Sequence, residues 1–344
     1  MKLKRYKNNP ILEPTSNWWE SRAVFNPAAV LKDKKVYLLY RAIGKHKNYA
    51  GYVSRFGLAI SKDGENFKRK KQPVFTSKEE YEKWTCEDPR IVKLKKRFFI
   101  TYTALGKPYG KGGWARAALA STLDFHNFKR HGTITERMAN DKDVVLFPEQ
   151  VNKRYVMLHR PFYWKKNRIY RTEKRVYIAI RRQLFEWPWR VKIPEYFPER
   201  PSVWISYSRN MIKWYGHKVI LEPTKHRWES WKIGAGPPPI KTDKGWLVIY
   251  HGIERMARKK YCYSTGAALL DLQDPSKVIA RTKEPILRPE EWYELEGDVP
   301  NVVFPSGAVI IRKRLYVYYG GADKYCCLAT CKLKELVDFL LSQK

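Results

Sequence analysis

The chain has 344 residues and carries 68 Lys and Arg against 34 Asp and Glu, a formal net charge of +34. An apolar fraction of 44%, with 13 Trp, 23 Tyr and 14 Phe, supplies enough burial for one large core or two ordinary ones, which excludes a disordered chain. No run of about 18 apolar residues occurs, so a membrane-spanning helix is excluded as well.

The distribution of charged residues and cysteines bears on partners and compartment. Lys and Arg are spread along the whole chain, so the positive charge alone is weak support for nucleic-acid binding, and none is expected. The basic first residues lead into Asn8 and Asn9 without an apolar stretch, so no signal peptide is expected. The cysteines lack the paired spacing of a zinc module, which predicts a cytoplasmic protein without a metal site: Cys86, Cys262, Cys326, Cys327 and Cys331.

Short runs of β-branched and aromatic residues, each preceded by a charged turn, predict β-hairpins along the chain. The clearest runs are 36–40, 98–102, 246–250 and 315–319. Helical periodicity is almost absent. A helical pattern is present in only two segments, and it predicts one helix over Leu333 to Leu341 and a second around Lys78 to Trp84.

These strand units repeat. A proline followed by apolar residues opens units at Pro10, Pro73 and Pro285, and turns of one kind recur at 60–64, 120–124 and 207–210. The 63-residue spacing from Pro10 to Pro73 suits a four-stranded blade with long loops, and the length accommodates five. We therefore predict an all-β fold, a single five-bladed β-propeller over 1–344 with a short C-terminal helix and a basic, Trp-rich insertion at about 165–200. A two-sheet sandwich is the alternative.

Polar residues stand at the same stage of successive units, where a propeller would direct them into its central channel. They comprise carboxylates, amides, cations and histidines: Asn26, Arg41, Asp88, Lys142, Asp143, His159, Arg160, His251 and Asp298. Inverting glycoside hydrolysis needs two carboxyl groups about 6.5–9.5 Å apart. Phosphorolysis needs one acid and a cationic cluster that holds phosphate. The residues alone leave both reactions open, and Glu87 to Arg90 also suits an ordinary turn.

Several longer stretches, in this order, resemble the β-1,4-mannoside phosphorylases of glycoside hydrolase family 130. They are 26–29, 87–90, 142–148, 159–161, 234–240, 250–252, 266–272, 297–305 and 318–323. The resemblance implies a five-bladed propeller and inverting phosphorolysis of β-1,4-linked mannosides to α-mannose 1-phosphate. The leaving group would be glucose, a manno-oligosaccharide or N-acetylglucosamine, and inorganic phosphate would be the co-substrate, without a metal or another cofactor.

The resemblance also assigns roles to single residues. The catalytic acid would be Asp88, which in that family is thought to pass its proton to the leaving oxygen through a hydroxyl of the mannose. Phosphate would be held by Arg41, Lys142, Arg160 and His251, and the mannose by Asn26, Asp143 and Asp298. Lys142 stands where many members have Arg, which replaces a bidentate fork with a point charge. The insertion at 165–200 is unlike other members and bears on the acceptor sugar.

Two other functions compete with phosphorolysis. One is an inverting β-mannoside hydrolase of the same fold, which would lack the cationic cluster. The other is a non-catalytic sugar-binding or RNA-binding propeller, for which the excess positive charge is the only support. The partners expected from the sequence are a β-mannoside and phosphate, with no membrane, and the sequence leaves open whether the chain forms a homo-oligomer.

Overall fold

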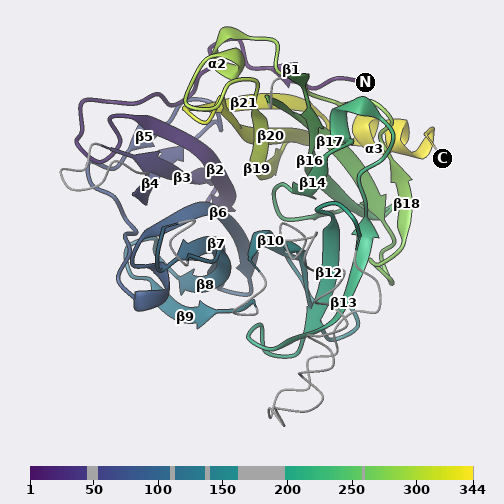
Figure 1. Ribbon diagram of the computed structural model, residues 1–344, viewed down its shortest axis with the longest axis horizontal. Helices are drawn as coiled ribbons and strands as arrows, with labels where there is room; N and C mark the ends of the chain where they lie inside the picture. Colours follow the sequence, from purple (N-terminus) through teal and green to yellow (C-terminus); the bar gives the residue numbers. More distant parts are fainter. Residues whose placement is uncertain (45–52, 109–112, 136–139, 162–197, 258–259, 344) are drawn as a thin grey trace.

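A computed structural model describes residues 1–44, 53–108, 113–135, 140–161, 198–257 and 260–343. In Figure 1 five antiparallel sheets are arranged in a ring, with one strand of each sheet nearest the centre. The fold is therefore the predicted five-bladed β-propeller, and the sandwich alternative is wrong. The predicted insertion at 165–200 falls almost wholly outside the described residues.

Blades 1, 2, 3 and 5 are four-stranded, and blade 4 has a short fifth strand. In blades 1 to 4 the innermost strand comes first in the chain, whereas blade 5 takes its outermost strand from the N-terminus (Figure 1). Blade 1 contains β2 (Ala23–Lys32), β3 (Lys35–Ile43), β4 (Ser54–Ser61) and β5 (Lys68–Arg69). Blade 2 contains β6 (Thr85–Leu94), β7 (Arg97–Leu105), β8 (Arg116–Thr122) and β9 (Lys129–Thr133). Blade 3 contains β10 (Asp141–Leu146), β11 (Tyr155–Pro161), β12 (Val203–Ser208) and β13 (Trp214–Leu221).

The remaining two blades complete the ring. Blade 4 contains β14 (Lys232–Ala235), β16 (Trp246–Arg255), β17 (Tyr261–Leu270) and β18 (Val278–Arg281), with β15 (Ile240–Lys241) paired to β16. Blade 5 contains β19 (Val303–Ile311), β20 (Arg314–Gly321), β21 (Tyr325–Lys332) and β1 (Lys4–Arg5). The four predicted strand runs are confirmed, because they lie within β3, β7, β16 and β20.

Helices are short and peripheral. The predicted C-terminal helix is confirmed as α3 (Leu333–Leu341), which buries Leu336, Val337 and Leu340. The prediction of a helix around Lys78 to Trp84 was wrong in extent: only a 3-10 turn forms at Glu80–Glu82, because Thr85 already begins β6. A second 3-10 turn lies at Arg227–Glu229, and α2 is the single turn Trp292–Leu295. Within the described ranges no helix is long and apolar enough to cross a membrane.

The innermost strands of blades 1 to 3 each contain a bulge at the same position. The pairing register shifts between Phe25 and Ala28 in β2, between Glu87 and Arg90 in β6, and between Lys142 and Val145 in β10. One residue of each bulge has a left-handed backbone, namely Asn26 at φ 48°, Asp88 at φ 51° and Asp143 at φ 54°. Asn and Asp tolerate this conformation best, and a bulge re-aims the side chain that it carries.

Four blades share a buried network that we call the Glu–Tyr–Arg triad. In each, a fully buried glutamate from the segment entering the blade accepts a hydrogen bond from a tyrosine of the second strand and pairs with an arginine of the outermost strand. The triads are Glu20–Tyr40–Arg69, Glu82–Tyr102–Arg130, Glu229–Tyr250–Arg281 and Glu294–Tyr319–Arg5. An ionised carboxylate is buried at tolerable cost only when it is paired and hydrogen-bonded, so each triad fixes three parts of a blade together.

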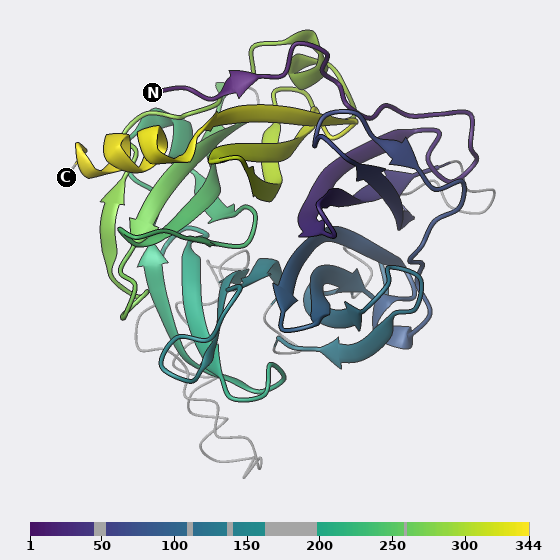
Figure 2. The same cartoon turned by 180° about the vertical axis from the view of Figure 1, so that it is seen from behind.

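The ring is closed by the two ends of the chain. β1 pairs antiparallel with β21, with Lys4 opposite Thr330 and Arg5 opposite Ala329. Figure 2 shows the N-terminal segment running along the outer edge of blade 5, on the same side of the molecule as α3. Blade 5 therefore contains strands from both ends of the sequence, and its core joins Leu3 to Leu336 and Leu340.

Candidate active site

The first part of the site is a hydrogen-bonded group around Asp88. Its carboxylate oxygen Oδ1 accepts a hydrogen bond of 2.8 Å from Asn26 Nδ2 and one of 3.1 Å from Arg41 Nη1. Arg41 lies on β3 and is aligned by its Nε, which donates to Ser54 Oγ at 2.7 Å. The left-handed bulges of β2 and β6 thus bring an amide and a carboxylate from two blades into contact, and β3 adds the guanidinium.

Glu87, the neighbour of Asp88, connects this group to blade 3. Its Oε1 accepts a hydrogen bond of 3.0 Å from Arg41 Nη2, and its Oε2 accepts one of 3.1 Å from Lys142 Nζ. Glu87 and Arg41 are buried, and the side chain of Lys142 is 22% exposed. Two of the predicted phosphate-binding cations therefore lie on either side of one carboxylate.

The opposite wall contains the other predicted residues. Arg160 Nη2 lies 2.6 Å from Asp143 Oδ2, and both side chains are buried. His251 Nε2 lies 3.6 Å from the same oxygen, and its ring packs at a tilt of 36° against Phe304, with 4.5 Å between the ring centroids. Gly234 makes room for this contact, since a Cβ there would overlap Asp143 Oδ2 and lie 2.6 Å from His251 Cε1.

The ionisation of two of these groups is strongly displaced. Burial opposes ionisation of Asp88, but Arg41 and then Lys142 outweigh it and lower the pKa of Asp88 to about 2. Burial lowers the pKa of His251 well below its ordinary value, with Arg160 and Arg90 adding to the effect. Without ligand, Asp88 is therefore ionised at neutral pH and His251 is neutral.

Arg90 connects blade 2 to the segment that follows β14 in blade 4, and it was assigned no role from the sequence. Its Nε donates to the carbonyl oxygen of Gly236 at 2.6 Å, and its Nη1 donates to the carbonyl oxygens of Asp88 and Pro89. The guanidinium also lies over the ring of Phe304, 5.4 Å from its centroid. Arg90 is 2% exposed, so it fixes the bulge that carries Asp88 from within the core.

Two acidic residues lie beside this cluster. Asp298, predicted to bind the sugar, accepts a hydrogen bond of 2.9 Å from Arg22 Nε. Asp323, in the turn between β20 and β21, was not predicted. Burial raises the pKa of Asp323 to about 7, with Arg41 opposing and with Asp88 and Asp298 adding to the rise. Asp323 therefore titrates near neutrality beside Asp88.

A second buried network stands behind Arg160. Asp141 Oδ1 accepts a hydrogen bond from the backbone N of Arg160 at 3.0 Å, and its Oδ2 lies 2.6 Å from His159 Nδ1. His159 Nε2 then contacts Ser206 Oγ at 2.8 Å, which contacts His217 Nδ1 at 2.7 Å. His159 is thus held between partners inside the blade, and Asp141 anchors the strand that carries Arg160.

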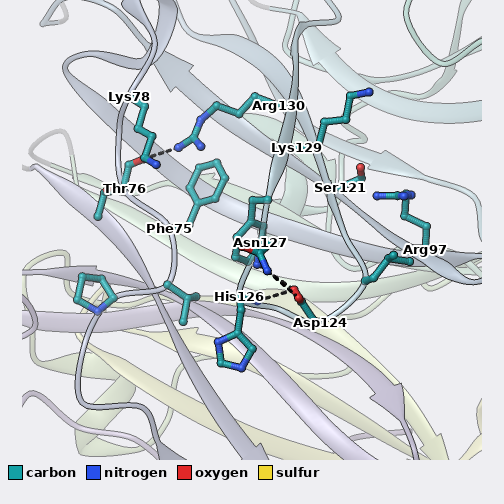
Figure 3. A pocket seen from close by; sticks show the side chains of 14 residues that line it. Phe75, Thr76, Lys78, Arg97, Ser121, Asp124, His126, Asn127, Lys129 and Arg130 are labelled. Carbon is teal, nitrogen blue, oxygen red and sulfur yellow. Dashed lines mark hydrogen bonds between the residues drawn. The ribbon is translucent and has the colours of Figure 1, made fainter.

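A separate pocket of about 710 Å³ lies on the outside of blade 2. Figure 3 shows its side chains, among them Lys78, Arg97, Lys129 and Arg130. Arg130 belongs to the Glu–Tyr–Arg triad of that blade, with its Nε 2.6 Å from Glu82 Oε1. None of the predicted site residues lines this pocket, so the candidate site is the central cluster and not this cavity.

Sequence reasoning therefore located most of the cluster and missed three of its members. The structure brings Asn26, Arg41, Asp88, Lys142, Asp143, Arg160 and His251 together, with Asp298 at the edge. Glu87, Arg90 and Asp323 were missed as site residues. Glu87 directly precedes the predicted acid, Arg90 follows it by two residues, and Asp323 ends the stretch 318–323 that carried part of the resemblance.

Comparisons with known proteins identify the family of this chain. The family model described as beta-1,4-mannooligosaccharide phosphorylase, glycoside hydrolase family 130, matches residues 2–342. A 1,2-beta-oligomannan phosphorylase and a beta-1,2-mannobiose phosphorylase, both of Thermoanaerobacter sp. (strain X514), are 40% and 38% identical, each covering 98% of this chain and 99% of the relative. The beta-1,2-mannobiose phosphorylase of Listeria innocua, solved with beta-1,2-mannobiose, superposes with a TM-score of 0.78 at 26% identity, covering 99% of both chains. The chain is therefore an enzyme of glycoside hydrolase family 130, the family of the mannoside phosphorylases.

Proposed function

We propose that this enzyme catalyses inverting phosphorolysis of a β-mannoside to α-mannose 1-phosphate. The observation that carries the proposal is the position of Asp88, which accepts a hydrogen bond of 3.1 Å from Arg41 while Glu87 ties Lys142 to the same guanidinium. An acidic side chain held beside a multi-blade cluster of cations suits a reaction with one acid and an anionic nucleophile.

The proposed roles follow from the charges. A phosphate oxygen attacks C1 of the mannose as the bond from C1 to the leaving oxygen breaks, which inverts the anomeric configuration. Asp88 supplies the proton that the leaving oxygen takes up, passed through a hydroxyl of the mannose. Arg41, Lys142 and Arg160 hold the phosphate by charge-assisted hydrogen bonds, and neutral His251 adds a ring N–H or a lone pair.

The sugar is proposed to lie against Asn26, Asp143 and Asp298, whose polar groups border the cations. No step passes through a metal or an organic cofactor, and phosphate is the co-substrate.

The sequence analysis predicted a β-1,4 linkage, in agreement with the description of the family model. The 40% and 38% identical relatives are named for β-1,2 linkages, and we therefore rank β-1,2-linked manno-oligosaccharides first.

The test is an incubation with β-1,2-mannobiose and, in parallel, β-1,4-mannobiose, each with and without inorganic phosphate. Phosphorus NMR should detect α-mannose 1-phosphate only when phosphate is present, and at the higher rate from the β-1,2 substrate. Release of free mannose at the same rate without phosphate would support the hydrolase instead. A faster reaction with the β-1,4 substrate would restore the linkage first predicted from the sequence.

A further inference from the structure

Glu87 is a buried glutamate of blade 2 that connects a cation of blade 1 to a cation of blade 3. It is 5% exposed, with Arg41 Nη2 3.0 Å from one carboxylate oxygen and Lys142 Nζ 3.1 Å from the other. The adjacent carboxylate, Asp88, bonds the other terminal nitrogen of the same guanidinium at 3.1 Å. Two carboxylates thus share one arginine at the meeting point of blades 1, 2 and 3.

We propose that Glu87 is a positioning residue for the acid: it holds Arg41 and Lys142 in place and offsets their charge at Asp88, so that Asp88 can take up the proton that it delivers. This inference rests on the proposed function, in which Asp88 is the acid. In this inference Glu87 does not touch the reacting atoms, but it controls the protonation of Asp88, which protonates the leaving oxygen.

The charged groups that face Asp88 come from several elements. Cations stand on β3, β6 and β10, an amide on β2, and like charges on β6 and in the turn after β20: Arg41, Arg90, Lys142, Asn26, Glu87 and Asp323. In the phosphate-free protein the cations prevail and lower the pKa of Asp88 to about 2. A general acid must carry its proton at the working pH. The lowering of the Asp88 pKa by these cations therefore has to be reduced in the complex that reacts.

Phosphate and Glu87 both reduce the effect of the cations on the pKa of Asp88. A phosphate dianion bound at Arg41 and Lys142 brings negative charge next to Asp88, and nearby negative charge raises the pKa of a carboxyl group. Glu87 supplies a permanent part of the same effect, because it bonds both cations directly. If the charge of Glu87 is removed, Arg41 and Lys142 act on Asp88 without compensation, and the pKa of Asp88 falls further.

The proton balance connects this effect to turnover. Protonated Asp88 releases its proton, through the mannose hydroxyl, to the leaving oxygen as the bond from C1 to that oxygen breaks and the bond to phosphate forms. Asp88 is left ionised and is reprotonated from solvent when the next phosphate is bound. Turnover therefore declines at pH values above the pKa of Asp88 in the complex, and this alkaline limb reports the charge around it.

The kinetic test compares Glu87→Gln and Glu87→Asp with Glu80→Gln, which removes an exposed glutamate from the 3-10 turn just before β6. In Glu87→Gln we expect the alkaline limb of kcat to move about one unit to lower pH, which means roughly tenfold slower turnover on that side. The KM for phosphate should stay the same or fall, because the cradle becomes more positive. Glu87→Asp should restore the limb, and Glu80→Gln should match the wild type.

A merely structural role would give a different result. It would lower kcat by the same factor at every pH, or lower the melting temperature, and it would do so in both Glu87→Gln and Glu87→Asp. That outcome would overturn the inference. An unmoved alkaline limb in a well-folded Glu87→Gln protein would overturn it too. If the wild-type enzyme showed no phosphate-dependent turnover of any mannoside, the proposed function would fail instead.

A binding measurement tests the same linkage without turnover. Sulfate is a dianion that does not titrate near neutral pH, so protons taken up when it binds come from the protein. Calorimetry of sulfate binding at pH 6, in buffers of different ionisation enthalpy, should detect proton uptake by the wild type and less by Glu87→Gln. Asp88→Asn reports the uptake by other groups, Asp323 among them. Equal uptake by all three proteins would overturn the inference.

Discussion

Arg5 Nε lies 2.9 Å from Glu294 Oε1, so the second residue of the first strand pairs with a carboxylate almost three hundred residues later. Glu294 is fully buried and also accepts a hydrogen bond from Tyr319 at 2.7 Å. The same arrangement occurs in three other blades, where the arginine comes from the blade's own outermost strand. The N-terminus therefore replaces a missing outer strand in both hydrogen bonding and charge.

Replacement of Arg5 should accordingly destabilise the whole ring. In Arg5→Ala the carboxylate of Glu294 stays buried without its cation, and loss of one partner of a buried pair costs about 3–5 kcal/mol. Urea unfolding should show that loss, with Lys4→Ala, an exposed neighbour on β1, as the control. A free energy of unfolding for Arg5→Ala within about 0.5 kcal/mol of the control would contradict the role of the triad.

The residues of the Glu–Tyr–Arg triads show why part of the fold escaped prediction. Each glutamate follows an aromatic residue directly, at Trp19, Tyr81, Trp228 and Tyr293, which is a signal visible in the sequence. The partners cannot be read in the same way, because Arg69 lies 49 residues after Glu20 and Arg5 lies 289 residues before Glu294. Only the closed ring determines which arginine meets which glutamate.

The site residues likewise divide into those signalled within one repeat and those brought together only when the ring closes. Asn26, Asp88 and Asp143 were predictable because a polar residue that tolerates a left-handed backbone recurs before an apolar strand in three blades. Asp323 was missed because it lies in a tight turn after β20, at the end of a blade, and faces Asp88 only after ring closure. Spacing within one repeat predicts residues at equivalent positions, but not contacts between non-equivalent ones.

Asp88→Asn should abolish most activity and leave the fold intact. Asn keeps an acceptor for Asn26 and Arg41 but carries no transferable proton, and a general acid contributes about 10²- to 10⁴-fold to the rate. The measurement is kcat for phosphorolysis beside the melting temperature. Asp33→Asn, an exposed aspartate with the same backbone φ of 51°, is the matched control. Retention of most activity by Asp88→Asn would mean that the acid is another group.

Arg160→Ala should weaken phosphate binding far more than sugar binding. Charge-assisted hydrogen bonds contribute about 1.5–3 kcal/mol each, so the KM for phosphate should rise roughly ten- to a hundredfold. Arg154→Ala, which removes the same charge just before the opposite end of β11, should leave it unchanged. Equal increases of KM for phosphate and for the mannoside would place Arg160 in general packing and not in a phosphate site.

Gly234→Ala should damage the wall formed by Asp143 and His251. The added methyl group would overlap the Asp143 carboxylate and press on the His251 ring, so both must shift. A displacement of about 1 Å in a positioned group can cost about 10²-fold in rate. We expect kcat/KM to fall at least tenfold, with circular dichroism unchanged. Unaltered kcat/KM would mean that neither side chain has to be held at this position.

His217 should make the protein less stable in acid. Burial, with His159 adding to it, lowers the pKa of His217 to about 4, against about 6.5 in an unfolded chain. Between these values the unfolded chain binds the proton and the folded protein does not. The stability present above pH 6.5 is therefore lost as the pH falls toward 4, by about 3 kcal/mol at most. His217→Gln can still bond Ser206, and in this variant the acid-dependent loss of stability that His217 causes should vanish. In His226→Gln, which replaces an exposed histidine as a control, the loss should persist. Urea unfolding at pH 7.5 and pH 4.5 measures the difference, and the same pH dependence in all three proteins would mean that His217 titrates alike in the folded and unfolded chains.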